Sequence, residues 1–295
     1  KVAEYGSNFI RGIQSNGIIA CAKHYPGHGN TSVDSHTSLP VIESSYDDLI
    51  KTEFYPFRKA VESGVEMIMT GHIALPAIDS TLMPASHSSL ITKSILRDEW
   101  GYKGLIVTDG LEMGALTKSS WAGESAIRAI EAGSDILLLP IDVDKTISSI
   151  VLAVESGRLS EDRIDRSVER IWDAKNRSEL FKSNGKIDWS SVEENINLSE
   201  SNGVSKMIAK ESITIVKDKL KYLPITKRKY KKLVHIHISK DEDVKQMLSP
   251  FSNDIRRTHR NVEEVFVQEE ISDYRMKELV DKASRSNMTI VSMLV

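Results

Sequence analysis

The chain has 295 residues, of which 40% are apolar and 27% are charged, and its formal net charge is −3. This composition suits one large globular domain or two smaller ones. The charge gives no surplus of lysine or arginine for a phosphate backbone, so we expect no nucleic-acid partner. No apolar run approaches the roughly 20 residues that cross a bilayer, so we expect no membrane-spanning segment. The single cysteine excludes an internal disulfide framework.

Residues 1–175 alternate between segments with helical spacing and short apolar runs. The opening segment Val2–Gln14 carries Phe9, Ile10 and Ile13 on one face and predicts a helix. Short runs rich in Ile, Leu, Val and Met predict strands that are buried on both faces. The predicted strands are Ile18–Ala22, Met67–Met69, Leu105–Val107 and Ile136–Leu139. The predicted helices between them are Leu49–Val61, which ends before Gly64, and Ile147–Val154, which ends before Gly157.

This alternation predicts an α/β fold built from parallel βα units, whose strands end at one shared edge of the sheet. Polar residues follow the strands at that edge: Lys23 and His24, then His72, then Asp109. The same edge is the active-site face of a (β/α)8 barrel. Only four units can be counted and a barrel needs eight. We therefore expect the C-terminal half of a TIM-type barrel, with the first half missing from this sequence.

The loop after the first predicted strand concentrates groups that can hold or move protons. These groups are Lys23, His24, His28, Asp34 and His36. Two glycines and two prolines shape the loop of residues 23–40. So many ionisable side chains would not stabilise a core segment, but they suit a catalytic loop. The remaining histidines, His87, His235, His237 and His259, have no partner that spacing reveals, so we expect structural or exposed roles for them.

A second region begins near Leu198, after a polar, linker-like stretch. A short helix is predicted around Val204–Lys210. Later apolar runs predict strands at Ile213–Val216, Leu233–Ile238, Val265–Val267 and Met288–Val295. We expect residues 1–198 to form the partial barrel and residues 199–295 to begin a smaller α/β domain with a mainly parallel sheet. Because nothing follows to cover the last strand, we expect truncation here too.

Several motifs together resemble glycoside hydrolase family 3, and within it the bacterial β-N-acetylglucosaminidases. The leading motifs are Lys23–Gly29 (KHYPGHG), Asp34–His36 (DSH) and Thr108–Met113 (TDGLEM). Met69–His72, Pro84–Ser86 and Glu131–Asp135 also fit in order, and Ala209–Lys217 resembles the entry to the family's second, αβα-sandwich domain. Motifs of this length and order seldom arise by chance.

The resemblance implies retaining hydrolysis of a β-linked N-acetylglucosaminide. A retaining enzyme needs a nucleophile on one face of the sugar and a proton donor near the leaving oxygen. By resemblance, Asp109 is the nucleophile that forms the glycosyl-enzyme. His36 corresponds to the subfamily's acid/base, and Asp34 would accept a hydrogen bond from its imidazole and favour the protonated form.

The resemblance also implies how the sugar is held and where the enzyme works. Lys23 and His24 match the family's contacts to sugar hydroxyls, and His72 is either a pocket residue that binds substrate or a hydrogen-bonded histidine at a strand end. No metal or organic cofactor is required. The implied substrate is a peptidoglycan fragment in which GlcNAc is joined to MurNAc or anhydro-MurNAc. We expect a secreted or cell-wall-associated protein of a Gram-positive-type bacterium, and the oligomeric state stays open.

Other functions remain in view. Within the enzyme class these are a β-glucosidase, whose family members lack the Asp-x-His loop, and a phosphorylase, because a histidine acid/base does not repel an anionic acceptor. His24, His28, Asp34, His36 and His72 could in principle surround a zinc ion in a metal-dependent barrel hydrolase. A non-catalytic sugar-binding protein is the last alternative, and we expect the segment alone to be inactive if half the barrel is absent.

Overall fold

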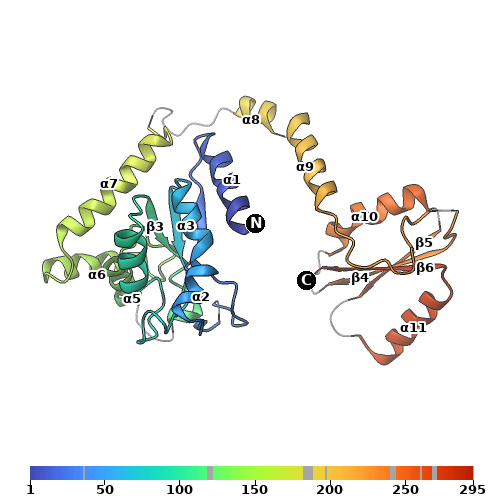
Figure 1. The fold of residues 1–295 in the computed structure, drawn as a ribbon, viewed down its shortest axis with the longest axis horizontal. Coiled ribbons are helices and arrows are strands. Elements are labelled where there is room, and N and C mark those ends of the chain that lie inside the picture. The colour runs from blue at the N-terminus through green and yellow to red at the C-terminus, as the bar shows by residue number, and fades with distance from the viewer. Residues whose placement is uncertain are drawn as a thin grey trace. The chain divides into compact units, whose positions relative to one another are not determined.

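The computed structural model describes residues 1–35, 37–117, 122–181, 189–196, 198–226, 228–239, 244–259, 261–267 and 271–294. The chain is α/β and divides into two compact units, Lys1–Trp189 and Ser190–Val295 (Figure 1). The sequence prediction placed the corresponding boundary at residue 198. Among the described residues, no helix combines the length and the apolar character needed to cross a bilayer.

The first unit holds a parallel sheet with helices packed around it (Figure 1). Its strands are β1 (Cys21–Tyr25), β2 (Met67–Thr70) and β3 (Leu105–Thr108). Its helical elements are α1 (Val2–Gln14), α2 (Tyr46–Lys51), α3 (Phe54–Glu62), the π-helix η1 (Leu90–Glu99), α4 (Gly114–Thr117), α5 (Ala122–Ala132), α6 (Val143–Glu155) and α7 (Glu161–Arg177).

The three strands lie in the order β1-β2-β3 and are parallel throughout. The predictions for β2 and β3 are confirmed, and each strand extends one residue beyond its predicted end. The predicted strand at 136–139 is reduced to a single parallel bridge between Val107 and Ile136. The Thr108 N–H donates to the carbonyl of Ile136 at 3.0 Å, so this segment still lies beside β3.

The first predicted strand is displaced along the chain. Ile18 is 63% exposed, and pairing begins only where Cys21 lies opposite Met67. The displacement buries Tyr25 completely against Phe54 and Phe57, with ring centroids 6.0 and 5.5 Å away. Burial of a large aromatic ring stabilises this register more than burial of the preceding isoleucines would. As a result, the polar residues predicted to follow the strand lie within it.

The helix predictions differ in detail from the structure. The predicted helix α1 is confirmed, but Phe9 is 68% exposed while Ile10 is buried. The segment between residues 49 and 61, which was predicted as one helix, is divided between two helices, α2 and α3. The second of them ends before Gly64, whose φ of 77° lies in the left-handed region that glycine adopts without strain.

A buried carboxylate ties α7 and η1 to β3. The Asp135 side chain has no exposed surface, and it forms ion pairs with Arg97 of η1 and with Arg170 of α7, the latter at 3.0 Å. Its Oδ2 also accepts the backbone N–H of Ile106 at 2.9 Å, while its Oδ1 accepts the Ser167 hydroxyl at 2.7 Å. These contacts hold β3, the strand that precedes Asp109, against the helices behind it.

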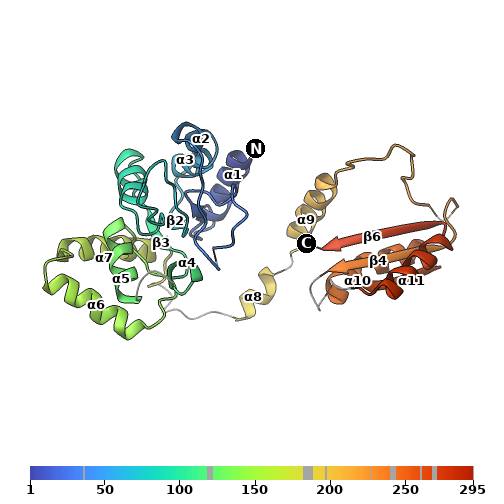
Figure 2. The same cartoon turned by 90° about the horizontal axis from the view of Figure 1, so that it is seen from below.

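The second unit contains another parallel sheet, in the order β5-β4-β6. Figure 2 shows β4 beside β6. Its elements are α8 (Trp189–Asn195), which starts at the unit boundary, α9 (Ser199–Ser212), β4 (Leu233–Ser239), α10 (Val244–Thr258), β5 (Val262–Val267), α11 (Asp273–Ser284) and β6 (Met288–Leu294). The predicted strand at 213–216 is wrong, because this segment pairs with no described strand and Val216 is 93% exposed. β-branched residues favour a strand where they pack against a neighbouring strand, and the described residues provide none here.

We predict that Asp135→Asn lowers the free energy of unfolding by about 3 kcal/mol or more, because it leaves buried guanidinium groups without their counter-charge. Urea denaturation followed by circular dichroism measures the change. Asp162→Asn is the matched control, because Asp162 is 72% exposed and pairs with Arg166 along α7, so its replacement should leave stability nearly unchanged. Equal stability losses in the two variants would contradict the role given to Asp135.

Candidate active site

Polar side chains of three chain segments meet at the carboxyl edge of the β1-β2-β3 sheet. The parallel register aligns the strand ends, since Thr70 lies opposite both Tyr25 and Thr108. The Asp109 N–H donates to the Thr70 carbonyl at 2.9 Å, which extends the ladder one step beyond β3. The edge therefore brings His24 and Asp109 together although 85 residues separate them in the sequence (109 − 24).

Asp109 presents its carboxylate to the open side of this edge. One oxygen, Oδ1, accepts the N–H of Gly110 at 2.9 Å, and the other, Oδ2, lies 3.7 Å from His24 Nε2. The two side chains are 18% and 31% exposed, so a ligand can reach them. Asp109 also lines a hollow of about 360 Å³ together with Glu112, Met113 and Leu139. A fixed, accessible carboxylate in a hollow can act as a nucleophile or hold a positive charge.

His72 lies behind Asp109 and is completely buried. Its Nε2 lies 2.9 Å from the carbonyl oxygen of Gly110, and its Nδ1 lies 2.8 Å from the Ser86 hydroxyl. Because the carbonyl can only accept, Nε2 carries the proton and Nδ1 accepts from Ser86. Burial lowers the pKa of His72, which keeps the imidazole neutral. This histidine thus holds the backbone next to Asp109, while its predicted contact with substrate stays a prediction.

Ser86 and His87 extend the support behind the edge. Burial lowers the pKa of His87 to about 3, and its Nε2 lies 3.0 Å from the Ser125 hydroxyl. Its ring centroid is 6.4 Å from that of His72. The sequence reasoning gave Ser86 no role, although it belongs to the motif Pro84–Ser86. Its place in that motif, as a small polar residue, was the sequence feature that could have indicated its role.

The remaining predicted residues lie on β1 and the loop that follows it. Lys23 is exposed and lines a different hollow, of about 1040 Å³, along with residues of α1 and α3. His28 lies with its ring centroid 6.3 Å from that of His24, and its Nε2 is 3.1 Å from the Ser35 hydroxyl. Asp34 is exposed, and its backbone carbonyl accepts the N–H of Thr37 at 3.0 Å. His36 lies outside the described residues.

The structure brings together two of the six predicted site residues, His24 and Asp109, and places His72 beside them through Gly110. Within the described part of the chain, one group of three histidine, cysteine or acidic residues is close enough to share a metal ion, and it lies in the second unit. The residues weighed for a zinc ion in the first unit, of which His36 is not described, do not appear in that group.

A parallel βα sheet with a carboxylate and histidines at its carboxyl edge is typical of the active-site face of an α/β enzyme. Residues 1–174 match the model of the glycosyl hydrolase family 3 N-terminal domain. The chain therefore belongs to glycoside hydrolase family 3, and the predicted family is confirmed.

The names of individual similar proteins agree with the family assignment. The chain is similar to the structure of a family 3 β-N-acetylglucosaminidase from Paenibacillus sp. str. FPU-7, with 31% identity and a TM-score of 0.85 over 99% of this chain and 56% of that one. Beta-hexosaminidase A of Pseudoalteromonas piscicida is 31% identical over 206 residues, or 63% of this chain and 34% of the relative. A beta-N-acetylglucosaminidase/beta-glucosidase of Cellulomonas fimi is 27% identical over 79% of this chain and 43% of the relative. The chain thus spans between about a third and a half of these two curated relatives.

Proposed function

We propose that this chain supplies the nucleophile and part of the sugar-binding face of a retaining β-N-acetylglucosaminidase. The observation that carries the proposal is the accessible carboxylate of Asp109 at the tip of β3, with His24 Nε2 3.7 Å from it. Attack by this carboxylate on the anomeric carbon would form a glycosyl-enzyme, which water then hydrolyses. Partial exposure lets a sugar ring replace solvent at the carboxylate, and no metal or organic cofactor is needed for this chemistry.

His24 would contribute on the glycone side of the site. Its Nε2 faces the Asp109 carboxylate, so an imidazole N–H at this position can donate to a sugar hydroxyl or to the carboxylate itself. Donors that hold the ring strengthen as charge spreads over it in the transition state. Lys23 would hold a further sugar hydroxyl on the strength of the family resemblance, although it lines a hollow that Asp109 does not line. His72 would act through the Gly110 carbonyl by keeping the Asp109 backbone in place.

The acid/base would come from the loop after β1. We assign this role to His36 and the role of its supporting carboxylate to Asp34, on the strength of the motif Asp34–His36 and the family resemblance. As an acid, the imidazole would protonate the leaving oxygen and later take a proton from water. Of this pair the structure describes Asp34, whose backbone carbonyl accepts the N–H of Thr37 at 3.0 Å.

The finer features of the protein belong to the same proposal. We place GlcNAc-MurNAc or anhydro-MurNAc fragments of peptidoglycan as the substrate, and a secreted or cell-wall-associated site of action. The sheet of residues 1–198 would form the C-terminal half of a TIM-type barrel, and residues 199–295 the start of an αβα sandwich. The name of the Cellulomonas relative favours β-glucosidase activity as a second candidate. Parallel assays on glucosides and N-acetylglucosaminides, with and without phosphate, separate the glucosidase and phosphorylase alternatives.

A fluorinated N-acetylglucosaminide tests the nucleophile. We predict that the complete natural protein accumulates a covalent adduct on Asp109, because fluorine slows both formation and hydrolysis of the glycosyl-enzyme, whereas a good leaving group speeds its formation alone. Peptide mass spectrometry locates the adduct. Glu112→Gln, which removes a neighbouring carboxylate of the same hollow, should still give the adduct, whereas Asp109→Asn should not. An adduct on another residue would refute the assignment.

The pH dependence of turnover tests the dyad. In the complete natural protein, Asp34→Ala should lower kcat by about 100-fold or more, which is the usual range for general acid catalysis. The alkaline limb of the profile should move to lower pH, because the imidazole of His36 loses the anion that favours its protonated form. Asp47→Ala removes another exposed aspartate, from α2, and should change neither value. An unmoved alkaline limb in Asp34→Ala would argue against the dyad.

A further inference from the structure

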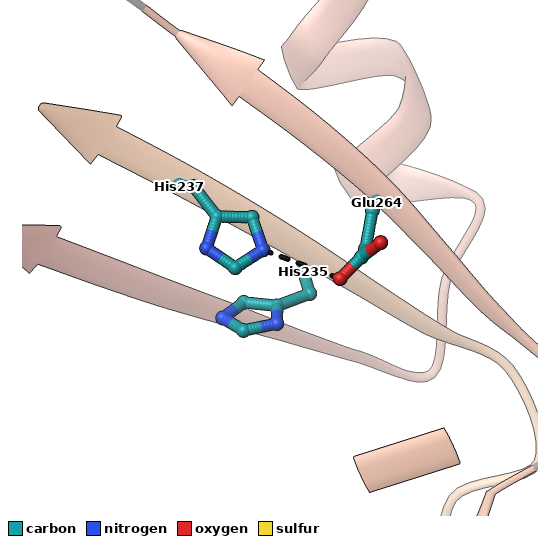
Figure 3. Close-up of side chains that lie close together, drawn as sticks. All are labelled: His235, His237 and Glu264. Atoms are coloured by element: carbon teal, nitrogen blue, oxygen red, sulfur yellow. Dashed lines mark ion pairs between the residues drawn. The ribbon is translucent and has the colours of Figure 1, made fainter. Parts of the chain in front are cut away.

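The second unit contains a cluster of two histidines and a glutamate in its interior (Figure 3). His235 and His237 alternate with Ile236 on β4, so both imidazoles lie on the same face of the sheet. Glu264 of β5 is the direct cross-strand partner of His235. The sheet register therefore assembles the cluster from two neighbouring strands.

The cluster is shielded from water by α10. Both histidine residues are 0% exposed, and the glutamate side chain is 14% exposed. Phe251 of α10 packs edge-on against the His235 ring, with centroids 5.4 Å apart. Burial, with help from His237, lowers the pKa of His235 to about 4, and burial also lowers the pKa of His237. The three side chains therefore lie in a part of the second unit from which most water is excluded.

Two ring nitrogens and a carboxylate oxygen face a common point. The Ser252 hydroxyl lies 3.2 Å from His235 Nδ1 and 3.1 Å from His237 Nε2, so both nitrogens are directed at it. Glu264 Oε1 lies 3.5 Å from the same His237 nitrogen. One ligand atom from each of the three residues falls within 4.8 Å of the others. This convergence is the geometry of a three-ligand site whose centre is close to the serine hydroxyl.

The surrounding groups orient two of the three ligands, His235 and Glu264. Ser292 of β6 lies 2.8 Å from His235 Nε2, and a hydrogen bond there leaves Nδ1 as the nitrogen with a free lone pair. Arg256 of α10 pairs with Glu264 Oε2, which leaves Oε1 for the cluster. Oε1 is buried and makes no hydrogen bond to a described residue. Partners of this kind fix ligand orientation in established metal sites.

We propose that His235, His237 and Glu264 bind a divalent transition-metal ion, with Zn²⁺ as the preferred ion. Two imidazoles and one carboxylate are an established zinc ligand set. Zn–N bonds of about 2.0–2.1 Å require that the Ser252 hydroxyl turn away from the point between the two rings and that the rings close around that point. Imidazole nitrogens favour zinc over Mg²⁺ and Ca²⁺, which prefer oxygen ligands. Three protein ligands leave a fourth position for water. The ion would link β4 to β5, independently of the proposed sugar chemistry.

Zinc titration of the chelator-treated full chain tests the site. Isothermal calorimetry with ZnCl₂ should show one tight site, and His237→Gln and Glu264→Gln should each weaken binding by about 100-fold or more. His259→Gln is the matched control, because this buried histidine of the same unit lies outside the cluster. His28→Gln tests for zinc held by the first unit. Both controls should bind zinc as tightly as the unaltered chain.

Two further measurements test the metal site even if a ligand variant fails to fold. Co²⁺ added to the unaltered chain should give the visible absorption bands of a four-coordinate site with nitrogen ligands. Ser252→Ala keeps the three ligands and removes the hydroxyl that lies between them, so its zinc affinity should equal or exceed that of the unaltered chain. The proposal is overturned if the unaltered chain binds no zinc at micromolar concentration, if binding survives in folded His237→Gln, or if Ser252→Ala abolishes binding.

Discussion

The candidate active site depends on the register of the parallel β1-β2-β3 sheet. Each strand contributes only four or five residues, yet the alignment of Thr70 with Tyr25 and Thr108 brings their carboxyl ends to the same level. A shift of one residue in a strand would turn its side chains to the opposite face and separate His24 from Asp109. The burial of Tyr25 and the buried ion pairs of Asp135 resist such a shift. Core packing therefore determines where the polar chemistry lies.

Different polar residues at this edge have different tasks. Asp109 and His24 are partly exposed and can meet a ligand, whereas His72 and His87 are buried and hydrogen-bonded to Ser86 and Ser125. A satisfied hydrogen bond adds only about 1 kcal/mol to stability, but an unsatisfied buried imidazole would cost more. Through the Gly110 carbonyl, His72 therefore holds the backbone next to Asp109 in one position. This arrangement fits the role proposed for Asp109, that of a nucleophile held in a fixed position.

The sequence predicted some parts of this architecture well. Apolar runs identified β2 and β3 because strands buried on both faces leave a clear pattern. The same rule failed at β1, whose register is determined by the ring of Tyr25 packing against residues about 30 positions later (54 − 25 = 29). It also failed at 213–216, where an apolar run lies without a described partner strand. Local pattern does not reveal which segments will pair.

Local sequence pattern was also insufficient to predict how the residues of the two sites come together. Motifs identified Asp109 and His24 without showing that they lie 3.7 Å apart. For His235 and His237, spacing revealed no partner, because Glu264 comes from the neighbouring strand and Ser252 from the covering helix. Their alternation on β4 indicated a shared face, but only the sheet register shows what meets it. Both sites are thus products of strand pairing, which is a long-range property of the chain.

The central claim is that a carboxylate at the tip of β3 attacks the sugar directly. The anomeric configuration of the first product tests this most directly, because a covalent intermediate requires two inversions and therefore net retention. Proton NMR of the complete natural protein acting on an aryl N-acetyl-β-glucosaminide should show β-N-acetylglucosamine appearing first, followed by slow mutarotation. If the α-anomer appears first, water attacks the substrate itself, and Asp109 is not a nucleophile.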